Sequence, residues 1–348
     1  MATRPLLATA PVPAMVSVII PNYNHARYLP HRLDSVLNQT YQQLEVILLD
    51  DCSTDNSREV LARYAQADSR IRLVYNDQNS GSTFKQWNKG IALATGKYVW
   101  LAESDDYAAP DFLATLVTTL EANERVGLAY SNSYSVDENE ALMPVPTWEP
   151  FLAELDATLW KHDFTQSGLA LVHRFLSYRN IIPNASAVLL RRSTLAEVGP
   201  ADESFKIMGD WIFWAKILAV SDVSYVARPL NYFRSHRNNV RSKTLVNGTA
   251  LVETTQLLGI VRQYGKPDGG FYQLAFQQLL DNWFHALVYY QVPFGRHKLA
   301  YQNMSKLDPN FRSLFLQNLG RFLLRNRFSG LKMLVGDKLK RVIKRAIN

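Results

Sequence analysis

The sequence predicts an α/β protein whose open sheet is flanked by helices, with a helical C-terminal extension. Over the first hundred residues, short apolar runs rich in β-branched side chains alternate with stretches of helical periodicity. The runs are continuously apolar, which indicates strands buried on both faces, as in a parallel sheet covered by helices. Polar and acidic residues follow several runs directly. In such sheets, ligands bind at the carboxyl ends of the strands.

The elements follow one another as strand, helix, strand. The segment between the first two strands carries apolar residues at Leu29, Leu33, Val36 and Leu37, which is the spacing of one helix face. The same alternation continues as far as residue 102. The predicted strands and helices are, in chain order, 16–21, 28–41, 44–49, 57–67, 71–75, 84–94 and 98–102.

Beyond the alternating region the pattern changes twice. Periodicity weakens through an aromatic-rich stretch, predicted to be an insertion over the site at about 144–186, and an apolar run at 187–190 indicates a returning strand. From Leu251 onward the spacing is helical. We therefore expect a flexible N-terminus at 1–15, a main domain at 16–243 and a helical region at 244–348.

Composition restricts the class of protein and its compartment. The single cysteine, Cys52, excludes an internal disulfide, and no apolar stretch is long enough for a membrane span or signal peptide, so we expect a cytoplasmic protein. The net charge of +7 lies in the tail, because residues 321–345 carry nine Lys or Arg and one Asp. The core is close to neutral, and we predict no nucleic-acid binding.

The basic tail at 320–348 carries apolar residues in steps of three and four, surrounded by Lys and Arg. A basic amphipathic helix of this kind can lie in the interface of an anionic membrane. It can equally pack its apolar stripe on the core. The first interpretation predicts peripheral attachment to the inner face of the cytoplasmic membrane, and both remain open.

Acidic residues gather directly after the strand at 98–102, as Glu103, Ser104, Asp105 and Asp106. Clustered carboxylates repel one another unless a cation or hydrogen-bond donors hold them. Mg²⁺ and Mn²⁺ prefer oxygen ligands and commonly bridge one or two carboxylates to substrate phosphates. The cluster therefore predicts a divalent-metal and nucleotide site. The alternative is a solvated turn in which Asp106 caps a helix that starts near Pro110.

Several segments share a characteristic order and spacing over roughly the first 240 residues. They are 18–24, 35–41, 50–55, 79–81, 90–98, 101–106 with 110–111, 208–214 and 229–236. Together they resemble the family 2 glycosyltransferases. The resemblance implies a GT-A fold, which is a Rossmann-like open mixed sheet, and an inverting transfer from a nucleotide-sugar donor, with a UDP-sugar favoured. It also implies Mn²⁺ or Mg²⁺ as cofactor and an acceptor that is a saccharide or lipid-linked glycan, as in bacterial surface polysaccharide synthesis.

On the donor side, the resemblance implies that Pro21 and Tyr23 line the base pocket and that Asp51 accepts a hydrogen bond from the base. An ionised carboxylate there suits the imide N–H of uracil or thymine, because it can only accept. A turn role after the strand is the alternative for Asp51. Lys85 either stands near the donor phosphates or is a solvated helical lysine. Ser104 is also assigned to donor binding.

The resemblance implies Asp105 as the metal ligand, with Glu103 close to the ribose or the ion. It implies His236 either as a third ligand or as a contact of the diphosphate. Many family members have Asp where this chain has Glu103. Direct displacement with inversion needs a carboxylate that takes the acceptor hydroxyl proton, and Asp210 is the predicted base. Asp210 precedes an aromatic, helical run, so it also fits a helix cap.

Asn184 and Ser186 lie where the acceptor is expected to approach and are predicted to hydrogen-bond it. Trp211 offers a ring face on which a sugar can stack, although tryptophans are more often core residues. The sequence also allows a homodimer. A sugar-nucleotide nucleotidyltransferase shares the sheet and metal, but the first strand is followed by Pro21-Asn22-Tyr23-Asn24 and not by a Gly-rich phosphate loop. A catalytically inactive nucleotide-sugar binding protein is the non-enzyme alternative.

Overall fold

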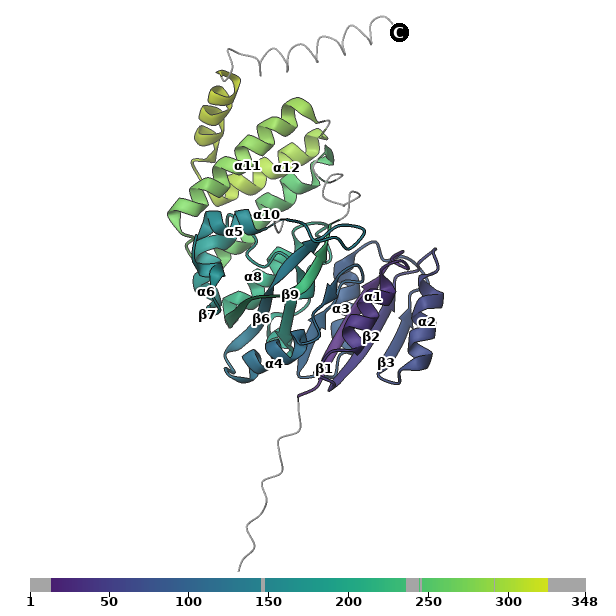
Figure 1. Cartoon of the computed structure of the whole chain (residues 1–348). Coiled ribbons are helices and arrows are strands. Elements are labelled where there is room, and N and C mark those ends of the chain that lie inside the picture. Colours follow the sequence, from purple (N-terminus) through teal and green to yellow (C-terminus); the bar gives the residue numbers. More distant parts are fainter. Residues whose placement is uncertain (1–13, 145–147, 236–243, 245, 291, 325–348) are drawn as a thin grey trace, which may run out of the picture.

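The computed structural model describes residues 14–144, 148–235, 244, 246–290 and 292–324. Its centre is one mixed sheet of nine strands, with helices on both faces and a group of C-terminal helices stacked beyond one end (Figure 1). This architecture confirms the predicted open mixed sheet flanked by helices and followed by a helical extension. Within the described residues, no helix combines the length and apolarity needed to cross a bilayer.

The first half of the sheet is parallel, and its elements follow the predicted alternation closely. Strands β1, β2 and β4 lie side by side, with β3 at the edge next to β2. Pro30 in the first turn of α1 suits the start of that helix, because its ring fixes a helical φ. The elements are β1 Val16–Asn22, α1 Leu29–Leu37, β2 Leu44–Asp50, α2 Ser57–Ala67, β3 Ile71–Tyr75, α3 Thr83–Leu93 and β4 Tyr98–Leu101.

Antiparallel pairs make the second half of the sheet mixed. Strand β8 pairs antiparallel with β4 and with β6, and β9 pairs parallel with β6. The elements are β5 Tyr107–Ala108, α4 Phe112–Glu121, β6 Val126–Val136, α5 Glu149–Leu155, η1 Leu159–Lys161, β7 Phe164–Ser167, α6 Gly168–Leu171, η2 Val172–Leu176, η3 Ala185–Ala187, β8 Val188–Arg191, α7 Arg192–Val198, α8 Gly209–Val220 and β9 Asp222–Arg234.

The stretch predicted as an insertion at 144–186 differs from that expectation. Strand β7 lies inside it and pairs antiparallel with β9, so this part of the chain extends the sheet. Its aromatic residues also face the core: Trp160 donates its indole N–H to Tyr130 Oη at 2.9 Å, and both side chains are buried. Strand β7 has one apolar side chain in four residues, which is too short a run to show the two-residue period that identifies a strand.

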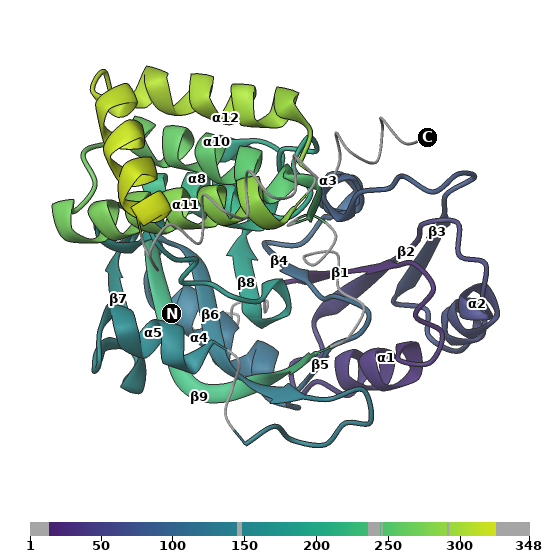
Figure 2. The same ribbon diagram turned by 90° about the horizontal axis from the view of Figure 1, so that it is seen from above.

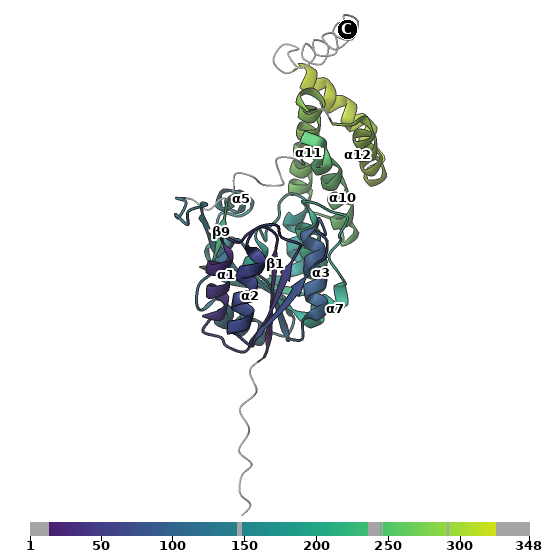
Figure 3. The same cartoon turned by 90° about the vertical axis from the view of Figure 1, so that its right-hand side faces the viewer.

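Alternate residues of the buried strands enter two separate cores, as the side-chain period of a strand requires. In β1, Val18 and Ile20 pack with α1, α2 and α4, whereas Ile19 packs with α3 and α8. Figure 3 shows α1 and α2 on one side of the strands and α3 and α7 on the other. Gly90 lets α3 approach β1 closely, because a Cβ there would lie 2.2 Å from Ile19.

The C-terminal helices share the second of these cores with the sheet. They are α10 Thr249–Gln263, α11 Gly269–Tyr289 and α12 Phe294–Leu307, and residues 311–324 are also helical. Leu257 and Trp283 belong to the same buried cluster as Phe213 of α8. Viewed from above, α10, α11 and α12 lie together over one end of the sheet domain (Figure 2). The helical region is therefore continuous with the main domain and is not an independent unit.

Candidate active site

Three strand-end loops meet at one edge of the sheet. Strands β1, β2 and β4 are parallel neighbours, so the loops that follow them at residues 22–24, 50–55 and 103–106 leave the sheet on the same side. Ligands of open α/β sheets bind at this edge. The structure therefore brings together the donor-side residues and the acidic cluster that the sequence predicts.

Asp51 is held by a set of neutral donors. Its Oδ1 accepts the backbone N–H of Ser80 at 2.8 Å and the amide groups of Asn76 and Gln86 at 2.6 and 3.0 Å, and its Oδ2 accepts the Ser80 hydroxyl at 2.8 Å. An ionised carboxylate has about four acceptor positions. Asp51 thus ties the end of β2 to the loop before α3, and its predicted contact with a base remains a prediction.

The loop after β1 presents Tyr23 at the surface. Pro21 is buried within β1, whereas Tyr23 is 45% exposed directly after it. Asn24 adopts a left-handed backbone with a φ of 57°, and its Oδ1 accepts the N–H of Thr54 at 2.7 Å. An asparagine tolerates this conformation better than most residues. The turn leaves the ring of Tyr23 available to a flat ligand beside the end of β1.

The acidic loop 103–106 is buried against other parts of the chain. The backbone N–H of Glu103 donates to Ser186 Oγ at 3.0 Å, and Glu103 Oε1 accepts the indole N–H of Trp87 at 2.7 Å. Asp106 Oδ1 accepts the backbone N–H of Arg234 at 2.9 Å. The alternative in which Asp106 caps a helix is wrong, because α4 begins at Phe112 and Asp111 occupies its cap position.

Burial leaves the charges of this loop poorly compensated. Burial, and then the neighbouring charge of Asp105, raise the pKa of Glu103 to about 8, and the same two causes raise the pKa of Asp106. Loss of hydration disfavours the ionised carboxylate, and a like charge nearby adds to that effect. A cation beside the loop would stabilise the ionised carboxylates and so oppose both effects. This electrostatic environment suits a divalent ion.

Two buried arginines donate hydrogen bonds to the backbone of the acidic loop. Arg32 Nε donates to the carbonyl of Glu103 at 2.8 Å, and Arg234 Nε donates to the carbonyl of Asp105 at 2.7 Å. Among the described residues, neither Nη atom of Arg32 has a hydrogen-bond partner. Burial lowers the pKa of Arg32 to about 10, against the raising effect of the three carboxylates. Both guanidinium groups offset part of the negative charge.

Arg32 is not among the site residues predicted from the sequence, although a signal for it exists there. Its position falls on the apolar face of α1, between Leu29 and Val36, where a charged residue is unexpected. A charge on such a face needs a buried partner. The partner could not be identified from the spacing, because the acidic loop lies about seventy residues further along the chain.

The donor set fits a hard divalent cation. Glu103 and Asp105 supply only oxygen atoms, and Mg²⁺ is usually bound by one or two carboxylates together with substrate phosphates. In the part of the chain that the structure describes, no three His, Cys, Asp or Glu side chains form a complete metal site. His236, the predicted third ligand, lies outside the described residues. The site thus fits an ion that is completed by a bound diphosphate.

Asp210 lies in the first turn of α8, one residue inside the helix. Its Oδ2 accepts the side-chain N–H of Asn180 at 3.2 Å. An acid at this position is favoured by the helix dipole. Trp211 is half-buried and donates its indole N–H to the carbonyl of Leu176 at 3.0 Å, which fixes its ring against the segment 172–176.

Helix α3 contacts Asp51, the acidic loop 103–106 and the start of α8. Gln86 donates to Asp51, Trp87 donates to Glu103, and Phe84 packs against Gly209, where a Cβ would lie 2.3 Å from its ring. The ring of Trp87 also contacts Trp214 of α8 at 5.9 Å between centroids. Lys85, the predicted donor-side residue of this helix, is exposed, and its Nζ lies 3.4 Å from the carbonyl of Ser80.

The segment 180–186 connects the acidic loop with α8. Asn180 contacts Asp210, whereas Ser186 is fully buried and contacts Glu103. Asn184 Oδ1 accepts the N–H of Ser186 at 2.8 Å. Ser186 therefore holds this segment against the acidic loop, and Asn184 caps the short helix that contains Ser186. The contact of these two predicted acceptor-side residues with an acceptor remains a prediction.

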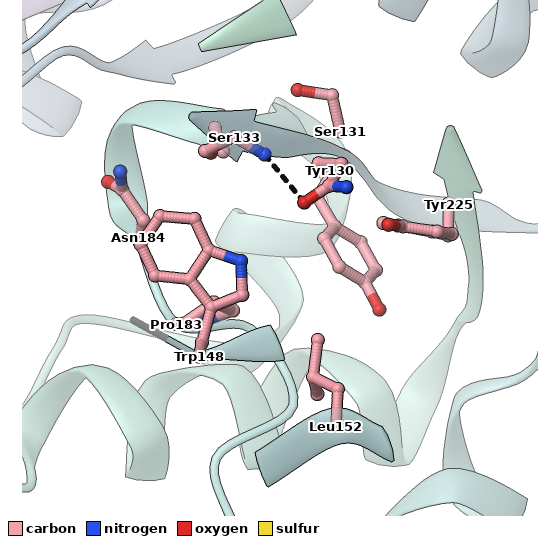
Figure 4. Close-up of a pocket in the computed structure, with 10 residues that line it drawn as sticks. Tyr130, Ser131, Ser133, Trp148, Leu152, Pro183, Asn184 and Tyr225 are labelled. Carbon is pink, nitrogen blue, oxygen red and sulfur yellow. Dashed lines mark hydrogen bonds between the residues drawn. The ribbon is translucent and has the colours of Figure 1, made fainter. Parts of the chain in front are cut away.

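Asn184 also lines a small pocket between α5 and the sheet. Figure 4 shows the ring of Trp148 beside Asn184, and the ring of Tyr130 across the pocket from it. Ser131, on β6, has a buried hydroxyl that lacks a hydrogen-bond partner among the described residues. Trp148 is buried, with 8% of its surface exposed. Its remaining lining residues are Asn132, Ser133, Leu152, Pro183, Ala187 and Tyr225.

Comparison with known proteins agrees with this geometry. Residues 17–179 match the family described as glycosyl transferase family 2. The glycosyltransferase GlyG of Streptococcus pneumoniae is 34% identical over 126 residues, which are 36% of this chain and 41% of GlyG. An uncharacterized glycosyltransferase of Nostoc is 30% identical over 227 residues, 64% of this chain and 66% of the relative. TuaG of Bacillus subtilis, a putative teichuronic acid biosynthesis glycosyltransferase, is 44% identical over 92 residues, 26% of this chain and 36% of TuaG. Each match thus spans less than two thirds of the relative.

Solved structures share the fold. S. aureus TarS in complex with UDP-GlcNAc superposes with a TM-score of 0.59 at 17% identity, covering 84% of this chain and 80% of that one. The mannosyltransferase PcManGT of Pyrobaculum calidifontis, in complex with GDP-Man and Mn²⁺, gives 0.55 at 17% identity, covering 94% and 86%. At such identities the likeness shows the fold alone, and it confirms the predicted GT-A type.

Proposed function

The chain belongs to glycosyl transferase family 2, and from this premise we propose that it is a metal-dependent, inverting glycosyltransferase. It moves a sugar from a UDP-sugar to a saccharide or lipid-linked saccharide acceptor in the synthesis of a bacterial surface polysaccharide. The observation that carries the proposal is that one side chain connects the acidic loop 103–106 with the helix that bears Asp210. Trp87 contacts both the acidic loop and the helix that bears Asp210.

The donor is proposed to bind along the edge formed by the loops after β1, β2 and β4. Tyr23 offers an exposed ring to the base beside Pro21, and Asp51 holds the loop 76–82 in place. The diphosphate then lies toward the acidic loop, where Asp105 and Glu103 would hold Mn²⁺ or Mg²⁺. When bound, such an ion neutralises the charge that develops on the leaving diphosphate.

The transfer itself is a single displacement. The acceptor hydroxyl oxygen forms a bond to the anomeric carbon of the donor sugar, while the bond from that carbon to the diphosphate oxygen breaks. The hydroxyl proton passes to the carboxylate of Asp210, which Asn180 orients through a hydrogen bond of 3.2 Å. Attack from the side opposite the leaving group inverts the anomeric configuration. General-base catalysis of this kind contributes about 10²–10⁴-fold to the rate.

A UDP-sugar and a polysaccharide acceptor are the finer parts of this proposal. TarS, which shares the fold, is described with UDP-GlcNAc, whereas PcManGT is described with GDP-Man. TuaG, a relative in sequence, is named for teichuronic acid biosynthesis. These names support the class of reaction and do not select the sugar.

A panel of UDP-, GDP- and dTDP-sugars tests the proposal. We expect one UDP-sugar to raise the melting temperature and to be hydrolysed slowly, both only with Mn²⁺ or Mg²⁺ present. Transfer to saccharide acceptors, followed by NMR of the product, gives the anomeric configuration. Stabilisation without any metal dependence contradicts the metal role. Unchanged activity in both Asp105→Ala and Asp210→Ala contradicts the assigned site. Binding without turnover supports a nucleotide-sugar binding protein.

Attachment to an anionic membrane surface is a separate part of the proposal. The tail at 320–348 that would carry it lies outside the described residues from 325 onward, and its support is the pattern of basic and apolar residues alone. Flotation with liposomes that contain anionic lipid tests it, using the full chain and a chain that ends at residue 324. Equal binding by the two chains contradicts the membrane role.

A further inference from the structure

A buried carboxylate from the C-terminal helices reaches the segment just before α8. Glu253, in α10, is 5% exposed. Its Oε1 accepts the backbone N–H of Lys206 at 2.8 Å, and its Oε2 accepts those of Ile207 and Met208, both at 3.0 Å. Three consecutive backbone N–H groups therefore converge on one side chain. Figure 1 shows α10 at the junction between the sheet and the C-terminal helices.

This contact fixes the start of α8. Met208 is the cap residue of that helix, and N–H groups at a helix start have no partner within the helix. A carboxylate is favoured there both as an acceptor and as a negative charge. Hydrogen bonds to a charged acceptor are shorter and stronger than those between neutral groups. Glu253 is therefore a strong restraint on the segment 206–208.

The other side of the same turn is fixed by packing. Gly209 lies against the ring of Phe84, and there is no room for a Cβ at that position. Asp210 follows directly, with Asn180 on its carboxylate. The turn that presents Asp210 is thus held between α3 on one side and α10 on the other. A shift of either support would move the carboxylate.

We propose that Glu253 is a positioning residue for Asp210, so that the C-terminal helices complete the acceptor side of the active site. The inference rests on the proposed function, since it gives Asp210 the role of base. Glu253 lies beyond residues 17–179, which match the family, and beyond the boundary predicted near residue 244. The helical region then takes part in catalysis through the backbone of residues 206–208.

The test compares two substitutions in α10. Glu253→Gln keeps the shape but removes the charge, and its amide N–H₂ group faces backbone donors. Thr255→Val is the control, because Thr255 is also buried in α10 and its hydrogen bonds go to Val252 and Asn303, not to residues 206–208. A misplaced catalytic group costs on the order of a hundredfold in rate. We expect kcat of Glu253→Gln to fall about tenfold to a hundredfold, with a smaller change in donor KM. Glu253→Asp, which keeps the charge, recovers part of the loss.

Amide hydrogen exchange provides a readout that does not depend on activity. We expect faster exchange over residues 204–212 in Glu253→Gln than in the wild type, and no change there in Thr255→Val. If Glu253→Gln has the same kcat and the same exchange rates as the wild type, the inference is overturned. An equal loss of kcat in Thr255→Val would also overturn it. If the wild type transfers no sugar from any donor, the proposed function fails. In that case unchanged exchange in Glu253→Gln still overturns the positioning role.

Discussion

Two acidic loops of this protein, at residues 50–55 and 103–106, follow the parallel strands on either side of β1 but differ in how their charge is balanced. In the first loop, Asp50 is paired with Arg58 at 2.9 Å, and Asp51 accepts four hydrogen bonds. Although burial opposes it, hydrogen bonds from Ser57 and Ala26 lower the pKa of Asp55. Protein donors therefore satisfy the carboxylates of this loop.

The second loop is not balanced in the same way. Burial and the charge of Asp105 raise the pKa values of Glu103 and Asp106, and the compensating cations are the buried side chains Arg32 and Arg234. The contrast teaches that acidic residues after a strand do not by themselves identify an ion site. The loop that protein donors satisfy fixes structure, and the loop that they leave under-compensated is the one suited to a cation.

The largest expected effect is that of Asp105→Asn, which removes the predicted ligand from the second loop. Transition-state charge on the diphosphate would then lose its stabilisation, and we expect transfer to fall about a thousandfold. The gain in melting temperature with Mn²⁺ should disappear as well. Kinetics and thermal unfolding with and without Mn²⁺ measure both. Asp55→Asn is the matched control in the first loop, and an equal loss of the Mn²⁺ response there would contradict the contrast.

Arg32→Gln should mainly affect stability. Removing one partner of a buried charge pair typically costs about 3–5 kcal/mol, because the remaining charges lose their compensation. We expect the metal-free variant to unfold at lower denaturant concentration than the wild type, and Mn²⁺ to restore more stability than it adds to the wild type. Urea unfolding with and without Mn²⁺ tests this. An equal effect of Mn²⁺ on both proteins would show that Arg32 and the ion do not act on the same charges.

Asp51→Asn tests the first loop. The substitution replaces a charged acceptor by an amide whose N–H₂ group faces the N–H of Ser80, and we expect a loss of about 2 kcal/mol in unfolding free energy. Donor KM should rise, while the Mn²⁺ concentration needed for half-maximal activity stays the same. Exposed Asp77 offers a control substitution nearby. A change in the Mn²⁺ requirement would mean that both loops contribute to the ion site.

The smallest effect is a pH dependence of the metal-free protein. Because the pKa of Glu103 is raised from 4.5 to about 8 on folding, the native state binds more protons than the unfolded state between these values. The stabilising contribution is complete below about pH 4.5 and is lost as the pH rises toward 8. Glu103→Gln should reduce this slope and leave the part that comes from Asp106, whose pKa is also raised. Thermal unfolding of the wild type and the variant between pH 5.5 and 8.5 measures the slope. An unchanged slope in the variant would assign the pH dependence to another group.

Much of the donor half could be predicted from the sequence, because its determinants are local. The helix Ser57–Ala67 and the strand Ile71–Tyr75 have the predicted bounds, since apolar periodicity records which face of each element is buried. Loops after parallel strands share one edge whatever the side chains are, so the meeting of residues 22–24, 50–55 and 103–106 also followed. The acceptor half was less predictable, and strand β7 was missed within the aromatic-rich stretch.

The sequence alone determined the α/β order of the elements and the positions of the acidic loops, together with the family that their spacing resembles. Only the tertiary structure decided which groups balance and hold them: Arg32 beneath Glu103, Trp87 between the acidic loop and α8, and Glu253 at the turn before Asp210. The physical reason is the distance along the chain over which each determinant acts. Periodicity and turn chemistry act over a few residues, whereas the partner of a buried charge is set by packing between segments far apart in the chain.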